Sequence, residues 1–176
     1  MEAALHTPLV RAAVIDAGRR WSGGDGVFRA APGLTLAVGG APPPEPLTGL
    51  VDALWVARGD APGPEGHGSL ALLRLELGEE LLRTTHARLR ARRAGDAPLA
   101  SLPTVRLRLG EATLALAEAR ESLGGHDGAA HARIDRATEL AAELHGGSSC
   151  LEGSVGDLLT LSTLLALPAT TTEETP

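Results

Sequence analysis

The chain has almost no aromatic side chains: its 176 residues include no tyrosine, one phenylalanine and two tryptophans. A core without aromatics must be built from leucine, alanine and valine, and leucine and alanine are strong helix formers. The composition therefore favours closely packed helices. A chain of this length suits one domain, with or without a small appendage, and can bury about two thirds of its unfolded surface.

Lysine is absent, so every basic residue is an arginine, and the formal net charge is −6. The only cationic run is Arg83–Arg93. Binding to nucleic acid through phosphates requires a larger cationic surface than this run provides. We therefore expect no nucleic-acid partner.

Cysteine is limited to Cys150, which excludes an intramolecular disulfide and fits a reducing compartment. No residue near it in the sequence marks it as a nucleophile, so we expect a small buried hydrophobic side chain. The first twenty residues contain no uninterrupted apolar region of the kind found in signal peptides. The longest apolar run, Leu158–Leu167, is too short to span a bilayer. We expect a soluble cytoplasmic protein that does not bind membranes.

Residues 1–67 differ in character from the rest of the chain. Their pattern predicts a short helix and three short strands: Leu5–Arg20, then Val27–Ala31, Leu34–Val38 and Leu50–Ala57. Between the last two strands lies GGAPPPEPLTG, whose prolines and glycines argue against any regular element there. Residues 61–68, APGPEGHG, have the composition of a linker.

Four segments with helical periodicity follow: Ser69–Arg93, Ser101–Leu123, Asp127–His145 and Ser154–Leu167. Pro103 is expected in the first turn of the second helix, where its missing N–H costs little. Asp127 is a suitable N-cap, and Gly146-Gly147 is a typical C-terminal signal. Pro168 is expected to end the last helix.

The apolar residues of these segments recur every three or four positions, as in helices that pack along one face. The repeating residues are Leu72, Leu73, Leu77 and Leu81; Val105, Leu109, Ala112 and Leu116, with Leu107 and Leu114 nearby; Ala130, Ile134, Ala137, Ala141 and Leu144; and Leu158, Leu159, Leu161, Leu164 and Leu165. We predict a mainly α fold: a four-helix up-and-down bundle over residues 68–168, preceded by an irregular segment with a little β (1–67) and followed by a disordered tail (169–176).

Two motifs carry a family resemblance. Arg92–Glu111 (RRAGDAPLASLPTVRLRLGE) aligns without a gap to RRxFGxPLAxxQAVRxxLADM, and Leu144–Glu152 (LHGGSSCLE) is similar to LHGGxGYxxE. Both patterns are typical of the C-terminal helical domain of the acyl-CoA dehydrogenases, which oxidise acyl thioesters with FAD. The resemblance covers about residues 68–170. A bundle of the same kind and an FAD site shared between subunits are what it implies.

The resemblance assigns cofactor contacts to Arg92, His145, Gly146 and Gly147. In the family, the arginine pairs with the flavin pyrophosphate of a neighbouring subunit, and the HGG turn approaches the same flavin. A guanidinium group suits a diphosphate. However, the family phenylalanine, glycine and glutamine are replaced here by Gly95, Asp96 and Pro103. An acidic residue beside a pyrophosphate and a proline without a donor both oppose flavin binding.

The catalytic base of many family members aligns with Ala169, which cannot accept a proton. Other members keep their base in the helix aligned with Ser69–Arg93, where Glu76, Glu79 and Glu80 lie, but none of these can be assigned to that position. We therefore name no catalytic residue. His126 and His131 do not form a zinc pattern and are expected on the surface, so no metal ligand is named.

Most of these residues also have a structural interpretation. The arginines near the end of the first helix complement a helix dipole, the HGG turn ends a helix, and the three glutamates form an exposed helical face. The apolar residues of Leu158–Leu167 belong to the core, to a contact between subunits, or to both.

Four hypotheses follow from the kept scaffold and the missing base. The first is a non-catalytic subunit that associates with itself or with a full-length acyl-CoA dehydrogenase. The second is a small non-redox enzyme, such as a cyclase, that binds an acyl or polyketide-like substrate in the bundle. The third is a dehydrogenase subunit whose FAD and acyl-thioester site is completed by a partner. The fourth is a truncated paralogue without a selected function.

Overall fold

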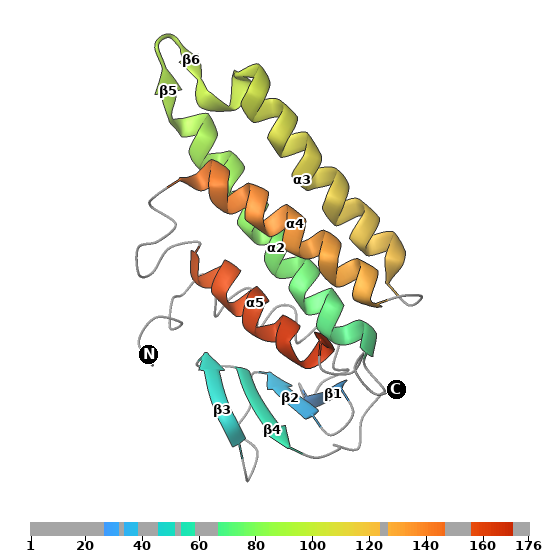
Figure 1. Ribbon diagram of the computed structural model, residues 1–176. Helices are drawn as coiled ribbons and strands as arrows, with labels where there is room; N and C mark the ends of the chain where they lie inside the picture. The colour runs from blue at the N-terminus through green and yellow to red at the C-terminus, as the bar shows by residue number, and fades with distance from the viewer. Residues whose placement is uncertain are drawn as a thin grey trace.

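A computed structural model describes residues 27–31, 34–38, 46–51, 54–58, 67–123, 127–146 and 156–170. The fold is mainly α, as predicted, with four helices packed together (Figure 1). They are α2 (His67–Ala91), α3 (Pro103–Ser122), α4 (Asp127–His145) and α5 (Gly156–Thr170). Consecutive helices run in opposite directions (Figure 1).

Helix α2 is the central element of the bundle. In its first half the buried residues are Ala71, Leu73, Arg74, Leu75, Leu77 and Gly78. It contacts all three other helices and strand β1 (Val27–Ala31). The remaining side carries the half-buried Glu76, Glu79 and Glu80, so the apolar stripe is broad but crossed by acidic residues.

The core between α2, α3 and α4 consists mainly of leucine and alanine. Its members are Leu75, Ala112, Ala115, Leu116, Ala119, Ile134, Ala137 and Leu140. The small residues allow the helices to approach closely, and Gly78 marks the tightest place: a Cβ atom there would lie 3.1 Å from Leu116 Cδ2 and 3.3 Å from Thr138 Cγ2. This confirms the expected core of small aliphatic side chains.

A short hairpin joins α2 to α3. It consists of β5 (Arg93–Ala94) and β6 (Ala97–Pro98), and a 3-10 turn, η1 (Leu99–Ser101), follows it. Gly95 takes a φ of 60° in the two-residue turn, a conformation that glycine adopts without strain. Pro103 occupies the start of α3, as predicted, with the backbone of Leu102 as its N-cap.

A four-stranded antiparallel sheet precedes the helices, in the order β1-β2-β4-β3. The predicted strands Val27–Ala31 and Leu34–Val38 are β1 and β2. The single strand expected over Leu50–Ala57 was wrong, because this stretch contributes to two paired strands, β3 (Pro46–Val51) and β4 (Leu54–Arg58).

The expectation that the proline-rich stretch forms no regular element was also wrong in its second half. Pro46 is the first residue of β3, and β3 is an edge strand of the sheet. A proline is tolerated at that position because the missing N–H need not pair with a neighbouring strand.

The ends of the helices agree only in part with the sequence signals. Helix α4 has the predicted bounds, and Gly146 follows it with a φ of 79°, donating its N–H to Ala142 O and Glu143 O at 3.1 Å. Pro168 does not end α5, which continues to Thr170. A proline so near the helix terminus removes one backbone hydrogen bond from the last turns and leaves the preceding ones intact.

Several predictions fall outside the described residues: the helix Leu5–Arg20, Cys150 and the end of the tail, residues 171–176. Among the residues that are described, no helix is long and apolar enough to cross a membrane.

Candidate functional site

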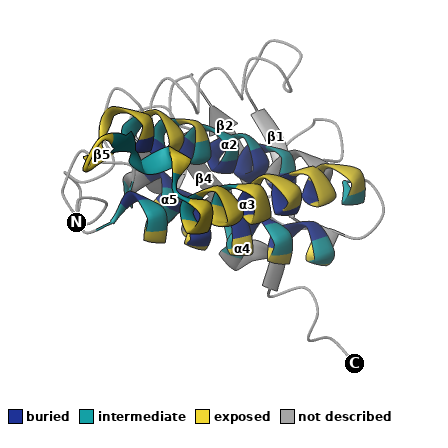
Figure 2. Cartoon of the chain, turned by 90° about the horizontal axis from the view of Figure 1, so that it is seen from above, coloured by how far each residue is buried: buried dark blue, intermediate teal, exposed yellow. Residues whose placement is uncertain are grey.

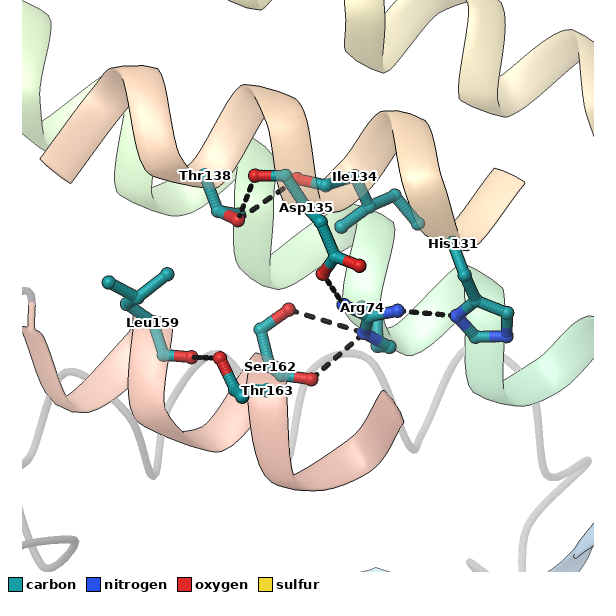
Figure 3. Close-up of polar contacts among 8 residues, drawn as sticks. All are labelled: Arg74, His131, Ile134, Asp135, Thr138, Leu159, Ser162 and Thr163. Carbon is teal, nitrogen blue, oxygen red and sulfur yellow. Dashed lines mark hydrogen bonds and ion pairs between the residues drawn. The ribbon is translucent and has the colours of Figure 1, made fainter. Parts of the chain in front are cut away.

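A buried arginine connects three helices. Arg74 of α2 has a side chain that is 0% exposed, in a run of leucines. Its Nε donates to Ser162 O of α5 at 2.8 Å and lies 3.4 Å from Ser162 Oγ (Figure 3). The guanidinium therefore ties α2 to α5 through the backbone as well as a side chain.

The other two nitrogens of Arg74 bind side chains of α4. Nη1 lies 2.5 Å from His131 Nδ1, and Nη2 forms an ion pair with Asp135 Oδ1. A guanidinium group only donates, so His131 Nδ1 must be the acceptor and the ring proton must be on Nε2. His131 is 8% exposed, which corrects the prediction that it lies on the surface.

Burial lowers the pKa of Arg74, and the carboxylate of Asp135 opposes this through its charge and its hydrogen bond. The charge is thus kept in the protein interior because each of its three nitrogens has an acceptor. These contacts hold α2 against α4 and α5. The signal in the sequence was an arginine between leucines, at Leu73-Arg74-Leu75.

A second polar cluster lies where α2 and α4 end. The hydroxyl of Thr85 is 3.3 Å from His145 Nδ1 and 3.4 Å from Ala141 O, and both Thr85 and His145 are buried. Burial lowers the pKa of His145, and the positive charges of Arg88 and Arg92 lower it further. Arg88 Nε is buried and has no hydrogen-bond partner among the described residues.

The structure therefore brings two of the predicted cofactor residues to the same end of the bundle. Arg92 directly follows α2 and is exposed, and His145 is the last residue of α4. Gly146 forms the expected turn, while Gly147 is outside the described residues. The arrangement concentrates positive charge at the carboxyl ends of two helices, as helix dipoles favour.

These residues fit the diphosphate of a flavin but not the rest of the cofactor. Gly95 and Asp96 form the exposed tip of the β5–β6 hairpin, where Asp96 adds a negative charge beside the arginines. Pro103 begins α3 and offers no donor. At most, the described residues supply part of a flavin site.

The positions that the resemblance suggests for a catalytic base lie on α5 and α2. Ala169 lies in the last turn of α5. Glu79 forms an ion pair with Arg120 of α3 at 2.5 Å, and Glu80 pairs with Arg83 at 2.5 Å, so both carboxylates already have cationic partners. The glutamates are half-buried, and the prediction of a fully exposed face was too simple. Across the described residues, no group of three or more potential ligands could hold a metal ion.

An open groove of about 1020 Å³ runs between α2 and α3. Its apolar lining includes Leu82, Leu109, Leu114 and Ala117, and charged residues such as Arg83 and Glu121 stand at its rim. Beside it, the outer face of α3 exposes two large hydrophobic side chains, Leu107 at 64% and Leu114 at 60%. In Figure 2 this face of α3 is the exposed one.

The sequence analysis placed Leu107 and Leu114 next to the packing face of this helix, but did not single them out. The two leucines are seven residues apart, and this spacing was the sequence signal for a second apolar face on the helix. Comparisons of the chain with protein-family models, with curated proteins and with solved structures find no match.

Proposed function

We propose that this chain is a non-catalytic helical-bundle subunit that acts by associating with another protein chain. The observation that carries the proposal is the apolar outer face of α3, where Leu107 and Leu114 are more than half exposed beside the groove. Single exposed leucines are ordinary on protein surfaces, but two on one helical face beside an apolar groove are typical of a contact surface.

The polar clusters support the non-catalytic part of the proposal. Each nitrogen of the Arg74 guanidinium has an acceptor, at Ser162, His131 or Asp135, and the Asp135 carboxylate opposes the lowering of its pKa by burial. The paired glutamates of α2 hold arginines of α2 and α3. In the described part of the chain, the ionisable groups with partners are thus used to join helices or helical turns.

The resemblance to acyl-CoA dehydrogenases adds a finer form of the proposal. The resemblance assigns the bundle to the domain through which those enzymes associate, so a full-length dehydrogenase and a second copy of this chain are the two partners to test. In the former case the chain would complete an assembly whose catalytic residues lie on the other subunit.

Native mass spectrometry of the protein purified from its source tests the proposal. A complex that contains a second chain, or two copies of this one, is the expected result. A monomer that recovers no partner even at high protein concentration would contradict it.

A second candidate is a subunit that shares an FAD site with a dehydrogenase. The observation that favours it is the cationic end of the bundle, where Arg92 is exposed and the buried Arg88 Nε has no hydrogen-bond partner in the part of the chain that the structure describes. A diphosphate is a suitable acceptor for the exposed guanidinium of Arg92. When bound, the flavin would supply the oxidant for an acyl thioester, while this chain's arginines would only bind and orient its phosphates.

The same purification repeated with added FAD separates the two candidates. Flavin that remains with the two-chain complex, and that is lost in Arg92→Ala but not in the neighbouring Arg90→Ala, would support the shared site. A complex that forms without retaining flavin would leave association as the function and remove the redox role. Retention of flavin by both variants would exclude Arg92 as a contact.

A further inference from the structure

Helix α3 is apolar on two opposite faces. One face is buried and consists of Ala112, Ala115, Leu116 and Ala119. The other contains Leu107, Gly110, Leu114 and Ala117, and each of these four is exposed. Since successive helical residues are about 100° apart around the axis, these two sets point in opposite directions. We call the exposed set the α3 seam.

The α3 seam has the spacing of a coiled-coil interface. Its residues alternate at intervals of three and four, with leucines seven apart at Leu107 and Leu114 and small residues between them. A Cβ atom at Gly110 would meet nothing within 4 Å, so the surface beside the leucines is open. A leucine from a facing helix can therefore insert between Leu107 and Leu114.

The charges on the two flanks of the seam differ in sign. Arg106 and Arg120 lie on one flank, and Glu111 and Glu118 lie on the other. Among the described residues Arg106 has no ion-pair partner, and Glu111 has only an exposed contact of 3.6 Å with Arg108. The seam therefore offers a free cation on one side and a weakly engaged carboxylate on the other.

This distribution selects both the partner and its direction. When two copies of α3 pack in parallel about a two-fold axis, the arginine flank of each lies against the glutamate flank of the other. Arg106 then faces Glu111 of the second copy, and the same pair forms again by symmetry. In an antiparallel dimer, arginines would face arginines and glutamates would face glutamates, which is unfavourable.

We propose that the partner of the α3 seam is a second copy of this chain, packed in parallel along α3. The inference rests on the proposed function, because it names the partner of the associating subunit. Leu107 and Leu114 of each copy form the apolar layers, Gly110 and Ala117 provide the space for close approach, and Arg106 and Glu111 fix the direction. The charged rim of the groove beside Leu114 flanks this contact.

Analytical ultracentrifugation of the full chain over a range of concentrations tests the interface. Leu114→Glu places two carboxylates at the centre of the seam and is expected to weaken dimerisation roughly 100-fold or more. Ala132→Glu is the matched control: it adds the same charge to an exposed position of α4, and we expect the dimerisation constant of the wild type. Helical circular dichroism of each variant shows that the bundle is intact.

A charge exchange tests the direction of packing. Arg106→Glu alone and Glu111→Arg alone should each weaken the dimer, and the double variant should restore it. On a Cys150→Ser background, Leu107→Cys and Ala117→Cys should each form a disulfide with the same residue of the second copy. An antiparallel dimer brings at most one of these two positions close to itself.

The outcomes separate this inference from the proposed function. If the Leu114→Glu and Ala132→Glu variants both dimerise as tightly as the wild type, the α3 seam is not the interface, although the chain still associates. If the double variant Arg106→Glu, Glu111→Arg does not restore dimerisation, or if neither cysteine variant forms a disulfide between the copies, the parallel arrangement is wrong. A wild-type chain that stays monomeric alone but binds a dehydrogenase would overturn the second copy as partner and support the proposed function. A chain that binds neither would overturn both.

Discussion

Arg74 shows how one residue can determine the arrangement of three helices. Its guanidinium is fully buried, and Asp135, whose side chain is 49% exposed, is its only ionic partner in the described part of the chain. Because a buried cation costs several kcal/mol without a counter-charge, the carboxylate matters more than its exposure suggests. The ion pair should be a large contribution to the stability of the α2–α4 contact.

Asp135→Asn should lower the free energy of unfolding by about 2 kcal/mol, because the isosteric amide leaves the buried guanidinium without a counter-charge. Glu139→Gln, which removes a carboxylate from an exposed position of the same helix, should change it by less than about 0.5 kcal/mol. Urea denaturation measures both. In an Arg74→Met background, Asp135→Asn should change the free energy of unfolding much less than in the wild type. An equal change in both backgrounds would contradict a direct ion pair.

His145 makes the stability of the bundle depend on pH. Its pKa is lowered from the ordinary 6.5 by burial and by the charges of Arg88 and Arg92. The unfolded chain therefore binds the proton more readily than the folded one, and protonation favours unfolding. Stability should be complete above about pH 6.5 and should fall as the pH drops from there toward the lowered pKa.

His145→Asn should reduce this loss, since the amide oxygen can replace Nδ1 near Thr85 Oγ1 but does not titrate. Midpoints of urea denaturation at pH 7.5 and 5.5 give the measurement for the variant and the wild type. His86→Asn changes an exposed histidine of α2 and serves as the control. A wild-type midpoint that falls no more between these pH values than that of His145→Asn would exclude His145 as the cause.

At the scale of the helices, two glycines have opposite expected effects. Gly78→Ala should lower the stability by about 1 kcal/mol, because the new Cβ would be 3.1 Å from Leu116 Cδ2 and overpacking outweighs the gain in helix propensity. Gly110→Ala should raise it by up to about 1 kcal/mol, because its Cβ meets nothing within 4 Å. Thermal unfolding at low protein concentration compares the two monomers. If Gly78→Ala instead raises the stability, the side chain of Leu116 can move away from the new Cβ atom without loss of packing energy.

Most of the helical elements could be predicted because their signals are local. Helix α4 was predicted with its observed bounds, since Asp127 and Gly146 mark both ends within the sequence itself. The division of Leu50–Ala57 between β3 and β4 could not be predicted in the same way. Strand pairing depends on which neighbour is available, and Pro46 is acceptable only because β3 lies at an edge.

The polar clusters were harder to predict than the helices. Arg74 is separated from His131, Asp135 and Ser162 by 57, 61 and 88 residues, and nothing in the local pattern indicates that they meet. The two basic residues predicted as cofactor contacts, Arg92 and His145, do lie at one end of the bundle.

At the scale of the whole molecule, α2 organises the fold because every other helix, and strand β1, packs against it. Its contact with β1 couples the sheet to the bundle, because loss of the sheet would uncover part of α2. Strand β1 also contacts α5, so the N-terminal segment rests on two of the four helices. We therefore expect the sheet and the helices to unfold together.

The scarcity of aromatic residues provides a direct way to observe this. Trp55 lies on β4, the other tryptophan, Trp21, precedes the sheet in the chain, and neither tyrosine nor tryptophan occurs in the four helices. Intrinsic fluorescence is thus emitted only from the N-terminal third of the chain, whereas circular dichroism at 222 nm is dominated by the helices. The two denaturation curves should coincide, and an earlier fluorescence transition would show that the sheet separates from an intact bundle. Tryptophan fluorescence therefore reports on the N-terminal third of the chain separately from the helices.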